Sequence, residues 1–208
     1  FFSILFFSPI FFILINFLLN IIHAKILLNL YFVYAFINSF IISISSGLII
    51  SISGLFISLT LVTIRSNILK QQILFFLTSI ILIVSPIIIS LGYFIILGDL
   101  RYLDFINYAV VILINCLFIL PFSIIVFFTR LKNIFLNFDD LKKSYQISDI
   151  NFFKIIFPLI KNNVLFIFSF ASALSFGDFT IISFFKNENF QTLPTLLYKL
   201  ISTYRFEE

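Results

Sequence analysis

The chain has 208 residues, of which 62% are hydrophobic and 11% charged, with a formal net charge of +4 and a mean hydropathy of +1.20. A soluble domain carries about 25% charged residues, so this composition excludes an ordinary soluble protein. Inside a bilayer, only helices and closed barrels satisfy every backbone polar group. The apolar stretches are continuous rather than alternating, which favours helices over barrel strands. The sequence therefore predicts an all-α protein, a polytopic transmembrane helical bundle.

The chain contains no methionine, one cysteine and one histidine. Cys116 has no second cysteine with which it could form a disulfide or a pair of metal ligands, and His23 follows the first apolar run as a polar residue at the end of a span. We therefore expect no metal site, no cofactor and no catalytic residue. Without methionine there is no initiator, so we expect an internal part of a longer protein.

The first 22 residues form a continuous apolar run that ends before His23 and Lys25. About 20 helical residues cross the roughly 30 Å hydrocarbon core of a bilayer. The run has neither the basic start nor the small-residue cleavage site of a secretory signal. We expect residues 1–29 to contain a transmembrane span and the link that follows it.

The next apolar region is too long for one upright helix, so we divide it into an interfacial lead-in and a span at about 40–63. This span contains six serines together with Gly47 and Gly54. Small residues let transmembrane helices approach one another closely. We therefore expect this span to be packed inside the bundle.

Three further spans are predicted at about 73–98, 108–129 and 164–185, which makes about five in all. Pro86 lies in the first of these three spans and Pro121 in the second. Proline removes one helical hydrogen bond and kinks the helix, and neighbouring helices can satisfy the freed carbonyl. We expect two kinked spans, in which the kinks serve either packing or gating.

The distribution of Lys and Arg predicts the orientation in the membrane. The link 64–72 and the segment 130–163 carry eight of the 13 basic residues, and the opposite side carries five. Cytoplasmic loops are enriched in Lys and Arg. We therefore expect both segments to face the cytoplasm and the tail at 186–208 to lie on the external side.

The segment 130–163, called the polar passage below, separates the last two predicted spans. Apolar residues recur at helical spacing over 138–145, and Asp149 or the serine before it offers the N-cap of a second helix. We expect this second helix to cover 150–157 and to end before Pro158. Two short amphipathic helices at a membrane surface must lie on the membrane or hold a partner.

The end of the polar passage, Ile155-Ile156-Phe157-Pro158, resembles the end of a cytoplasmic signature, E-A-A-x3-G-x9-I-x-L-P, found in permease subunits of binding-protein-dependent ABC importers. Counting back from Pro158 places Asp139 at the glutamate and Tyr145 at the glycine, and a shift by one residue places Gln146 there instead. The resemblance implies that this segment seats in a cleft on an ATPase subunit and transmits ATP-driven closure. The implied coupling residues are Asp139, Asp140, Tyr145, Gln146, Ile155, Phe157 and Pro158.

The segment 174–205 contains Gly177-Asp178-Phe179 and Thr192-Leu193-Pro194, and it resembles the thiamine permeases of the same family. The resemblance covers about residues 30–208. It implies the permease core of a type I ABC importer, with 130–163 as the cytoplasmic coupling loop. The chain would then be a multi-pass subunit in a bacterial inner membrane, and it would line the path of thiamine.

The same resemblance implies the partners. A cytoplasmic ABC ATPase subunit, an external soluble substrate-binding protein and membrane lipid are expected, whereas nucleic acid is not. The chain contains no G-x-x-x-x-G-K-[ST] loop, so we expect ATP hydrolysis in a separate chain and no enzyme activity in this one.

Asp178 is the only carboxylate inside a predicted span. An Asp at the centre of a transmembrane helix costs roughly 2.5 to 3.5 kcal/mol on insertion scales, so it should face the bundle interior or an interface. We name Asp178, Gly177 and Asn115 as candidates for the substrate path, where a carboxylate would stabilise the thiazolium charge of thiamine. The alternative is that Asp178 caps a helix broken at Gly177.

Two other functions remain open from the sequence. One is a permease of the same architecture for ferric iron or a related substrate. The other, from a different class, is a respiratory or proton-translocating membrane subunit. Such a subunit would carry intramembrane Lys, Glu or His relays. The predicted spans contain no Lys or Glu, which argues against it.

Overall fold

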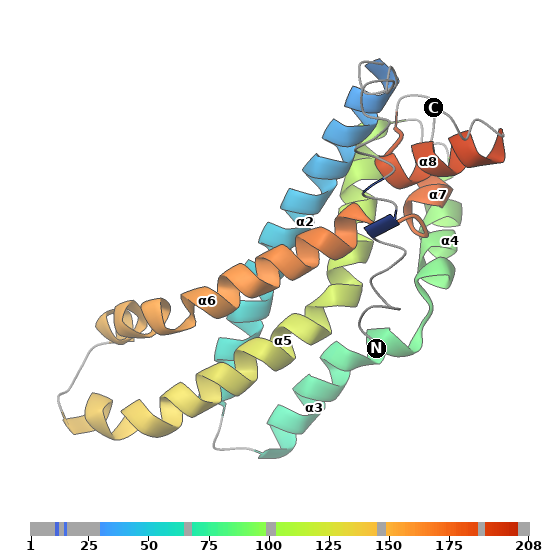
Figure 1. Ribbon diagram of the computed structural model, residues 1–208. Helices are drawn as coiled ribbons and strands as arrows, with labels where there is room; N and C mark the ends of the chain where they lie inside the picture. Colours follow the sequence, from blue (N-terminus) through green and yellow to red (C-terminus); the bar gives the residue numbers. More distant parts are fainter. Residues whose placement is uncertain are drawn as a thin grey trace.

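The computed structural model describes residues 11, 12, 15, 30–64, 68–98, 103–144, 149–186 and 190–203, and every regular element in them is a helix (Figure 1). The prediction of an all-α fold is therefore confirmed. From residue 30 onward the described elements are α2 (Leu30–Thr63), α3 (Ile68–Ser79), η3 (Ile80–Ile83), α4 (Pro86–Leu97), α5 (Asp104–Ser144), α6 (Asp149–Phe176), α7 (Ile182–Phe185) and α8 (Leu193–Ser202).

Among the described residues, three helical segments are long and apolar enough to cross a membrane: Leu30–Thr63, Asp104–Leu136 and Ile156–Phe176. A fourth span results if Phe75–Ile83 and Pro86–Leu97 are counted as one bent pair. The predicted first span, at 1–22, lies almost entirely outside the described residues. The described part is thus a polytopic helical bundle, as its composition predicts.

The predicted span at 73–98 is broken rather than kinked. Its two halves meet at an angle of 87°. Ser85 is extended, and its side-chain oxygen accepts a hydrogen bond from the backbone N–H of Ile87 at 3.4 Å, while Pro86 occupies the first turn of α4. Proline is tolerated at this position because it has no N–H to leave unpaired. Pro86 therefore begins a new helix instead of bending an existing one.

Helix α2 packs against both α5 and α6, with its small residues at the contacts. A Cβ atom added to Gly47 would lie 2.2 Å from the side-chain oxygen of Ser172 on α6, and one added to Gly54 would lie 2.2 Å from that of Ser123 on α5. The prediction that this helix is packed through small residues is confirmed. It begins at Leu30, so the predicted lead-in is helical as well.

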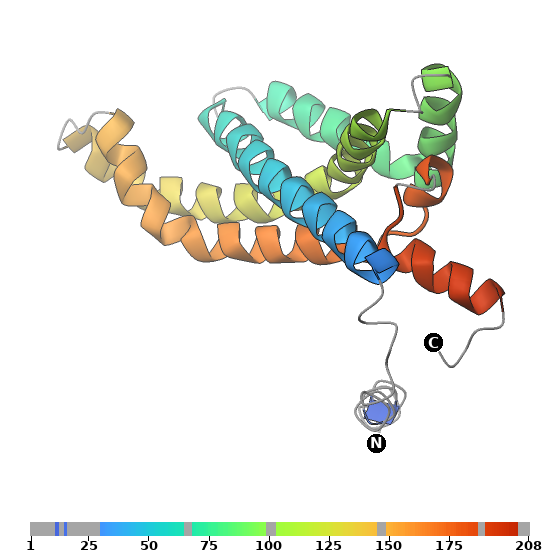
Figure 2. The same ribbon diagram turned by 90° about the horizontal axis from the view of Figure 1, so that it is seen from above.

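Helices α5 and α6 run side by side toward the segment that joins them, and their ends project from the rest of the bundle in both views (Figures 1 and 2). The prediction that a helix ends before Pro158 is wrong, because Pro158 lies inside α6. Ile156, Ile160, Ile167 and Ala171 are all buried and fall on one helical face. This continuous packed face outweighs the local cost of the proline.

Beyond α6 the chain turns back and fills the other end of the bundle. The predicted span at 164–185 stops as a helix at Phe176, and α7 follows after a turn. Phe190 is fully buried in a cluster with residues of α2, α5 and α7, and its ring lies edge-on to Tyr108 at a centroid distance of 4.6 Å. The segment after α6 is therefore part of the core.

Candidate functional site

Asp178 lies in the turn between α6 and α7. One of its carboxylate oxygens, Oδ1, accepts a hydrogen bond from the backbone N–H of Ile181 at 3.2 Å. A side-chain oxygen placed before a helix satisfies an amide that has no helical partner. The geometry thus gives one carboxylate oxygen a capping contact next to the end of α6 at Phe176, where Gly177 begins the turn.

The second carboxylate oxygen, Oδ2, is buried and has no hydrogen-bond partner among the described residues. The side chain of Asn115 on α5 is close enough to interact with the carboxylate of Asp178, yet its amide nitrogen makes no hydrogen bond in the described structure. Buried polar groups in proteins are normally paired, and each exception needs an explanation. Two predicted substrate-path residues that are far apart in sequence are thus neighbours with unused donor and acceptor atoms.

Serine side chains continue this polar region along α6. The hydroxyls of Ser172 and Ser175 are buried and have no partner within the described part of the chain. Ser43 on α2 donates a hydrogen bond to the backbone carbonyl of Ser172 at 2.8 Å. A set of buried polar atoms therefore extends from the Asp178 turn into the contact between α2 and α6.

A second polar cluster, which the sequence pattern does not predict, joins α2 to the segment around the start of α8. The amide of Asn38 donates to the carbonyl of Gln191 at 2.8 Å, and its oxygen accepts from the hydroxyl of Tyr108. The Ser39 hydroxyl accepts from the backbone N–H of Leu193 at 2.8 Å. The available signal was that Asn38 and Ser39 precede Ser43 and Ser46 at helical spacing, which places them on the same helix face.

Helix α8 has a strong start within the motif Thr192-Leu193-Pro194. Thr192 is buried and forms a capping box with Thr195, and the backbone N–H of Thr192 donates to the Thr195 hydroxyl at 2.9 Å. Pro194 lies in the first turn of the helix. The motif therefore both begins α8 and ties it to α2.

The predicted coupling residues that the structure describes lie at or near the projecting ends of α5 and α6. Asp139 and Asp140 belong to the last turns of α5, and Ile155 belongs to α6. The structure describes the backbone at these three positions but not the side chains. Tyr145 and Gln146 lie outside the described residues. The last two predicted residues, Phe157 and Pro158, are exposed on α6.

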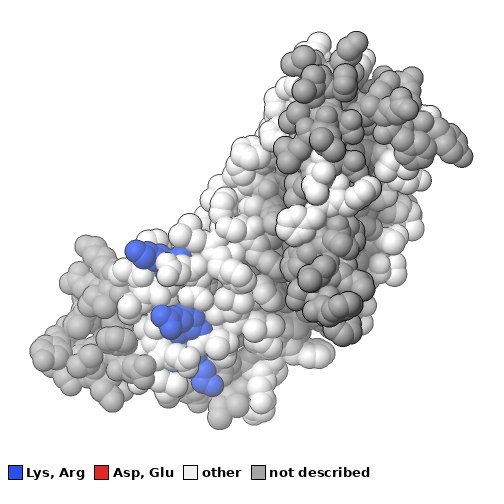
Figure 3. Space-filling view, viewed as in Figure 1, with Lys and Arg blue, Asp and Glu red and all other residues white. Residues whose placement is uncertain are grey.

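Basic side chains gather at the same end of the molecule. The blue side chains in Figure 3 lie where α5 and α6 project, and the described basic side chains of these two helices are Arg130, Lys132 and Lys161. The Arg130 guanidinium donates to the carbonyl of Leu159 on α6 at 3.5 Å. This end therefore combines positive charge with a direct link between the two helices.

Over the described residues, no group of three or more His, Cys, Asp or Glu side chains comes together that could hold a metal ion. The only described cysteine, Cys116, is buried, and its thiol faces the carbonyl of Ser46 at 3.9 Å. The polar atoms of the candidate site are amide, hydroxyl and carboxylate groups. Such groups can bind an organic cation or a polar solute.

The fold and the apolar helices define a multi-pass α-helical membrane protein. No family model matches the chain. Its sequence is 28% identical over 145 residues to the thiamine transport system permease protein ThiP of Escherichia coli (strain K12), which covers 69% of this chain and 27% of the relative. The ThiP protein of Salmonella typhimurium is 30% identical over 129 residues, covering 62% of this chain and 24% of the relative.

The ThiP protein of Brucella abortus (strain 2308) is 28% identical over 167 residues, covering 78% of this chain and 31% of the relative. The chain therefore spans about a third or less of the length of the curated relatives it matches. The chain is similar to thiamine permeases over most of its own length. Together with the apolar helices, this similarity identifies the chain as a multi-pass protein of the inner membrane.

Proposed function

We propose that this chain forms part of the membrane-spanning permease subunit of a binding-protein-dependent ABC importer for thiamine. The observation that carries the proposal is the similarity to ThiP proteins of several bacteria over 62–78% of this chain. The helical bundle with its apolar spans is the architecture such a subunit requires.

The projecting ends of α5 and α6 are the proposed contact with the ATPase subunit. The paired helices lead away from the bundle and carry positive charge, so they can seat in a cleft of a soluble partner (Figure 3). Asp139, Asp140, Tyr145, Gln146, Ile155, Phe157 and Pro158 are the proposed coupling residues. ATP hydrolysis belongs to that partner, and this chain carries no catalysis of its own.

The buried region around Asp178 is proposed to form part of the substrate path. Thiamine carries a permanent positive charge on its thiazolium ring, and a carboxylate oxygen without another partner can stabilise that charge. Oδ2 of Asp178 is such an oxygen among the described residues, and the side chain of Asn115 lies close to the same carboxylate. Gly177, which starts the turn, leaves the backbone there without a side chain.

The segment from α7 through α8 is the proposed external surface, where a soluble thiamine-binding protein docks. Lys199 and Tyr198 of α8 are exposed, whereas Thr195 and Leu196 pack inward. The hydrogen bonds from Asn38 and Ser39 hold this segment against α2. A fixed external surface suits repeated docking of a soluble protein.

The decisive experiment is to purify the permease that contains this chain, test for a bound ATPase subunit and then measure ATP hydrolysis. A thiamine-loaded binding protein should stimulate hydrolysis, and an iron-loaded one should not. Stimulation by the iron-loaded protein would replace thiamine with ferric iron as the substrate. Failure to recruit any ATPase subunit would refute the importer function itself.

A further inference from the structure

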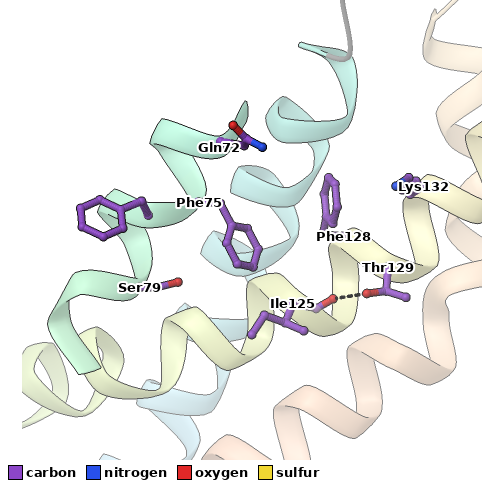
Figure 4. A pocket seen from close by; sticks show the side chains of 8 residues that line it. Gln72, Phe75, Ser79, Ile125, Phe128, Thr129 and Lys132 are labelled. Atoms are coloured by element: carbon purple, nitrogen blue, oxygen red, sulfur yellow. Dashed lines mark hydrogen bonds between the residues drawn. The ribbon is translucent and has the colours of Figure 1, made fainter. Parts of the chain in front are cut away.

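A cavity of about 490 Å³ lies between α3 and α5, away from the buried polar region around Asp178 (Figure 4). Its volume falls within the range of about 300 to 1,000 Å³ that is typical of small-molecule sites. The proposed import function assigns it no role. The chemistry of its lining indicates what it binds.

The α3 wall is a single helical stripe. Gln72, Phe75, Phe76 and Ser79 line the cavity at positions i, i+3, i+4 and i+7. Phe76 is 62% exposed, so the cavity is open on this side of the described helices. Seven residues of helix correspond to about 10 Å, which is a substantial part of one leaflet of the hydrocarbon core.

The α5 wall repeats the same spacing with Ile125, Phe128, Thr129 and Lys132. The Phe128 ring packs against the ring of Phe75 from α3, with a centroid distance of 6.3 Å. The hydroxyl of Thr129 donates to the carbonyl of Ile125 at 2.8 Å, as Figure 4 shows, so this polar group is satisfied within its own helix. The walls along most of the cavity are therefore apolar.

The cavity is polar at one end. Figure 4 shows Gln72 and Lys132 toward the same side, with Ser79 and Ile125 toward the other. Gln72 directly precedes the predicted span at 73–98, and Lys132 follows the predicted span at 108–129. The polar end therefore lies at the predicted cytoplasmic boundary of the membrane, and the apolar part extends into the hydrocarbon core.

Lys132 is the basic residue in the lining. It is exposed, and Arg130, two residues earlier, reaches in another direction toward the Leu159 carbonyl of α6. A cation at the membrane boundary above an apolar groove complements an anionic headgroup above an acyl chain. This match of charge and polarity is what selects the occupant.

We propose that this cavity binds one anionic phospholipid of the cytoplasmic leaflet, with its phosphate at Lys132 and an acyl chain lying along the apolar surface of Phe75, Phe76 and Phe128. The lipid fills the space between α3 and α5, where the bent pair of helices leaves the bundle. It thereby supports the position of α3 beside α5. The proposal depends on the cavity and the membrane boundary, and it holds whichever substrate the permease carries.

The test uses the purified membrane protein that contains this chain, titrated in detergent with phosphatidylglycerol or phosphatidylcholine and examined by native mass spectrometry. Wild-type protein should bind phosphatidylglycerol more tightly than phosphatidylcholine. Lys132→Gln should weaken phosphatidylglycerol binding about fivefold, the factor expected for one basic residue near an anionic lipid surface. Lys199→Gln removes the same charge from α8 and should leave binding unchanged.

A second variant tests the groove without changing charge. Ser79→Phe fills the apolar end of the cavity and should weaken binding of both lipids, while Lys132 stays in place. The proposal is overturned if Lys132→Gln binds like the wild type, or if Lys199→Gln weakens binding equally. Displacement of the lipid by excess inorganic phosphate would also overturn it, because the site would then recognise a free anion.

Discussion

Asp178 illustrates how a single carboxylate can serve structure and chemistry with different atoms. Oδ1 accepts a hydrogen bond from the backbone N–H of Ile181, whereas Oδ2 is buried without a partner among the described residues. The two alternatives from the sequence, a cap and a cation site, therefore concern different oxygens. A substitution that removes the charge but keeps the cap, compared with one that removes both, can distinguish them.

Asp178→Asn should retain an oxygen for the cap and lose the negative charge, so we expect normal assembly with strongly reduced uptake of labelled thiamine. Asp178→Ala should lose both, and the lost cap should lower the free energy of unfolding by about 1 kcal/mol. Uptake in vesicles and thermal stability in detergent would be measured together. Near-normal uptake by a well-assembled Asp178→Asn variant would rule out the charge role.

Two glycines provide a matched test of helix packing. An added Cβ at Gly54 would lie 2.9 Å from the Cβ of Ser123, so α5 would have to shift, whereas an added Cβ at Gly92 would meet nothing within 4 Å. We expect Gly54→Ala to destabilise the protein by about 1–3 kcal/mol through overpacking. Gly92→Ala should stabilise it by up to about 1 kcal/mol through helix propensity. Thermal melting in detergent should show shifts of opposite sign.

At the scale of elements, proline has different effects in different helices. Pro86 begins α4, where its missing N–H is harmless, but Pro158 lies inside α6 and interrupts its hydrogen bonding. Local sequence signals predict a helix end before Pro158, which is wrong. They also predict only a kink near Pro86, where the structure has a break at 84–85 and a change of direction. Both outcomes depend on tertiary packing, which a pattern of residues along one helix does not contain.

Pro158→Ala should therefore stabilise the protein, by about 1–3 kcal/mol, because a helix that is already continuous regains a hydrogen bond. Pro86→Ala should change stability little, because that position has no helical hydrogen bond to regain. Thermal melting and helical circular dichroism of the two variants provide the comparison. Equal shifts for both would contradict a continuous α6.

The link between α2 and the segment before α8 predicts a local effect. Asn38→Leu removes the hydrogen bonds to the Gln191 carbonyl and the Tyr108 hydroxyl and leaves these partly buried groups without that partner, at a cost of about 1 kcal/mol. We expect faster hydrogen exchange in residues 190–203. Ser45→Ala is the control, because in the described part of the chain the Ser45 hydroxyl bonds only within its own helix, to Ile41 and Ile42.

For the whole molecule, composition and the continuous apolar runs were enough to predict a helical bundle in a membrane, and the small residues of α2 predicted its packed position. The sequence predicts Asp178 and Asn115 as path residues one by one, but it does not predict that they are neighbours, because 63 positions of sequence separate them. The lead-in that the sequence predicts before residue 40 contains Asn38, which the structure buries. Burial of a polar residue by distant segments leaves no periodic signal.

The orientation in the membrane is testable with single cysteines. Cys116 is buried, so the wild-type chain provides a background of low reactivity. In intact cells, Lys199→Cys should react with a membrane-impermeant maleimide, whereas Lys161→Cys should react only after permeabilisation. The reverse pattern would place the ends of α5 and α6 outside the cell and would exclude contact with a cytoplasmic ATPase.

Helix α6 connects the projecting end of the molecule directly to the turn that holds Asp178. Its 28 residues correspond to about 42 Å measured along the helix, from the projecting end beside the proposed ATPase contact to a point two residues before Asp178. The part near the projecting end, which contains Pro158, is bent relative to the rest (Figure 2). Because α6 remains one helix through this bend, a movement imposed at its projecting end can be carried along the helix to its opposite end. ATP-driven movement on one side of the membrane would thus change the surroundings of the buried carboxylate on the other.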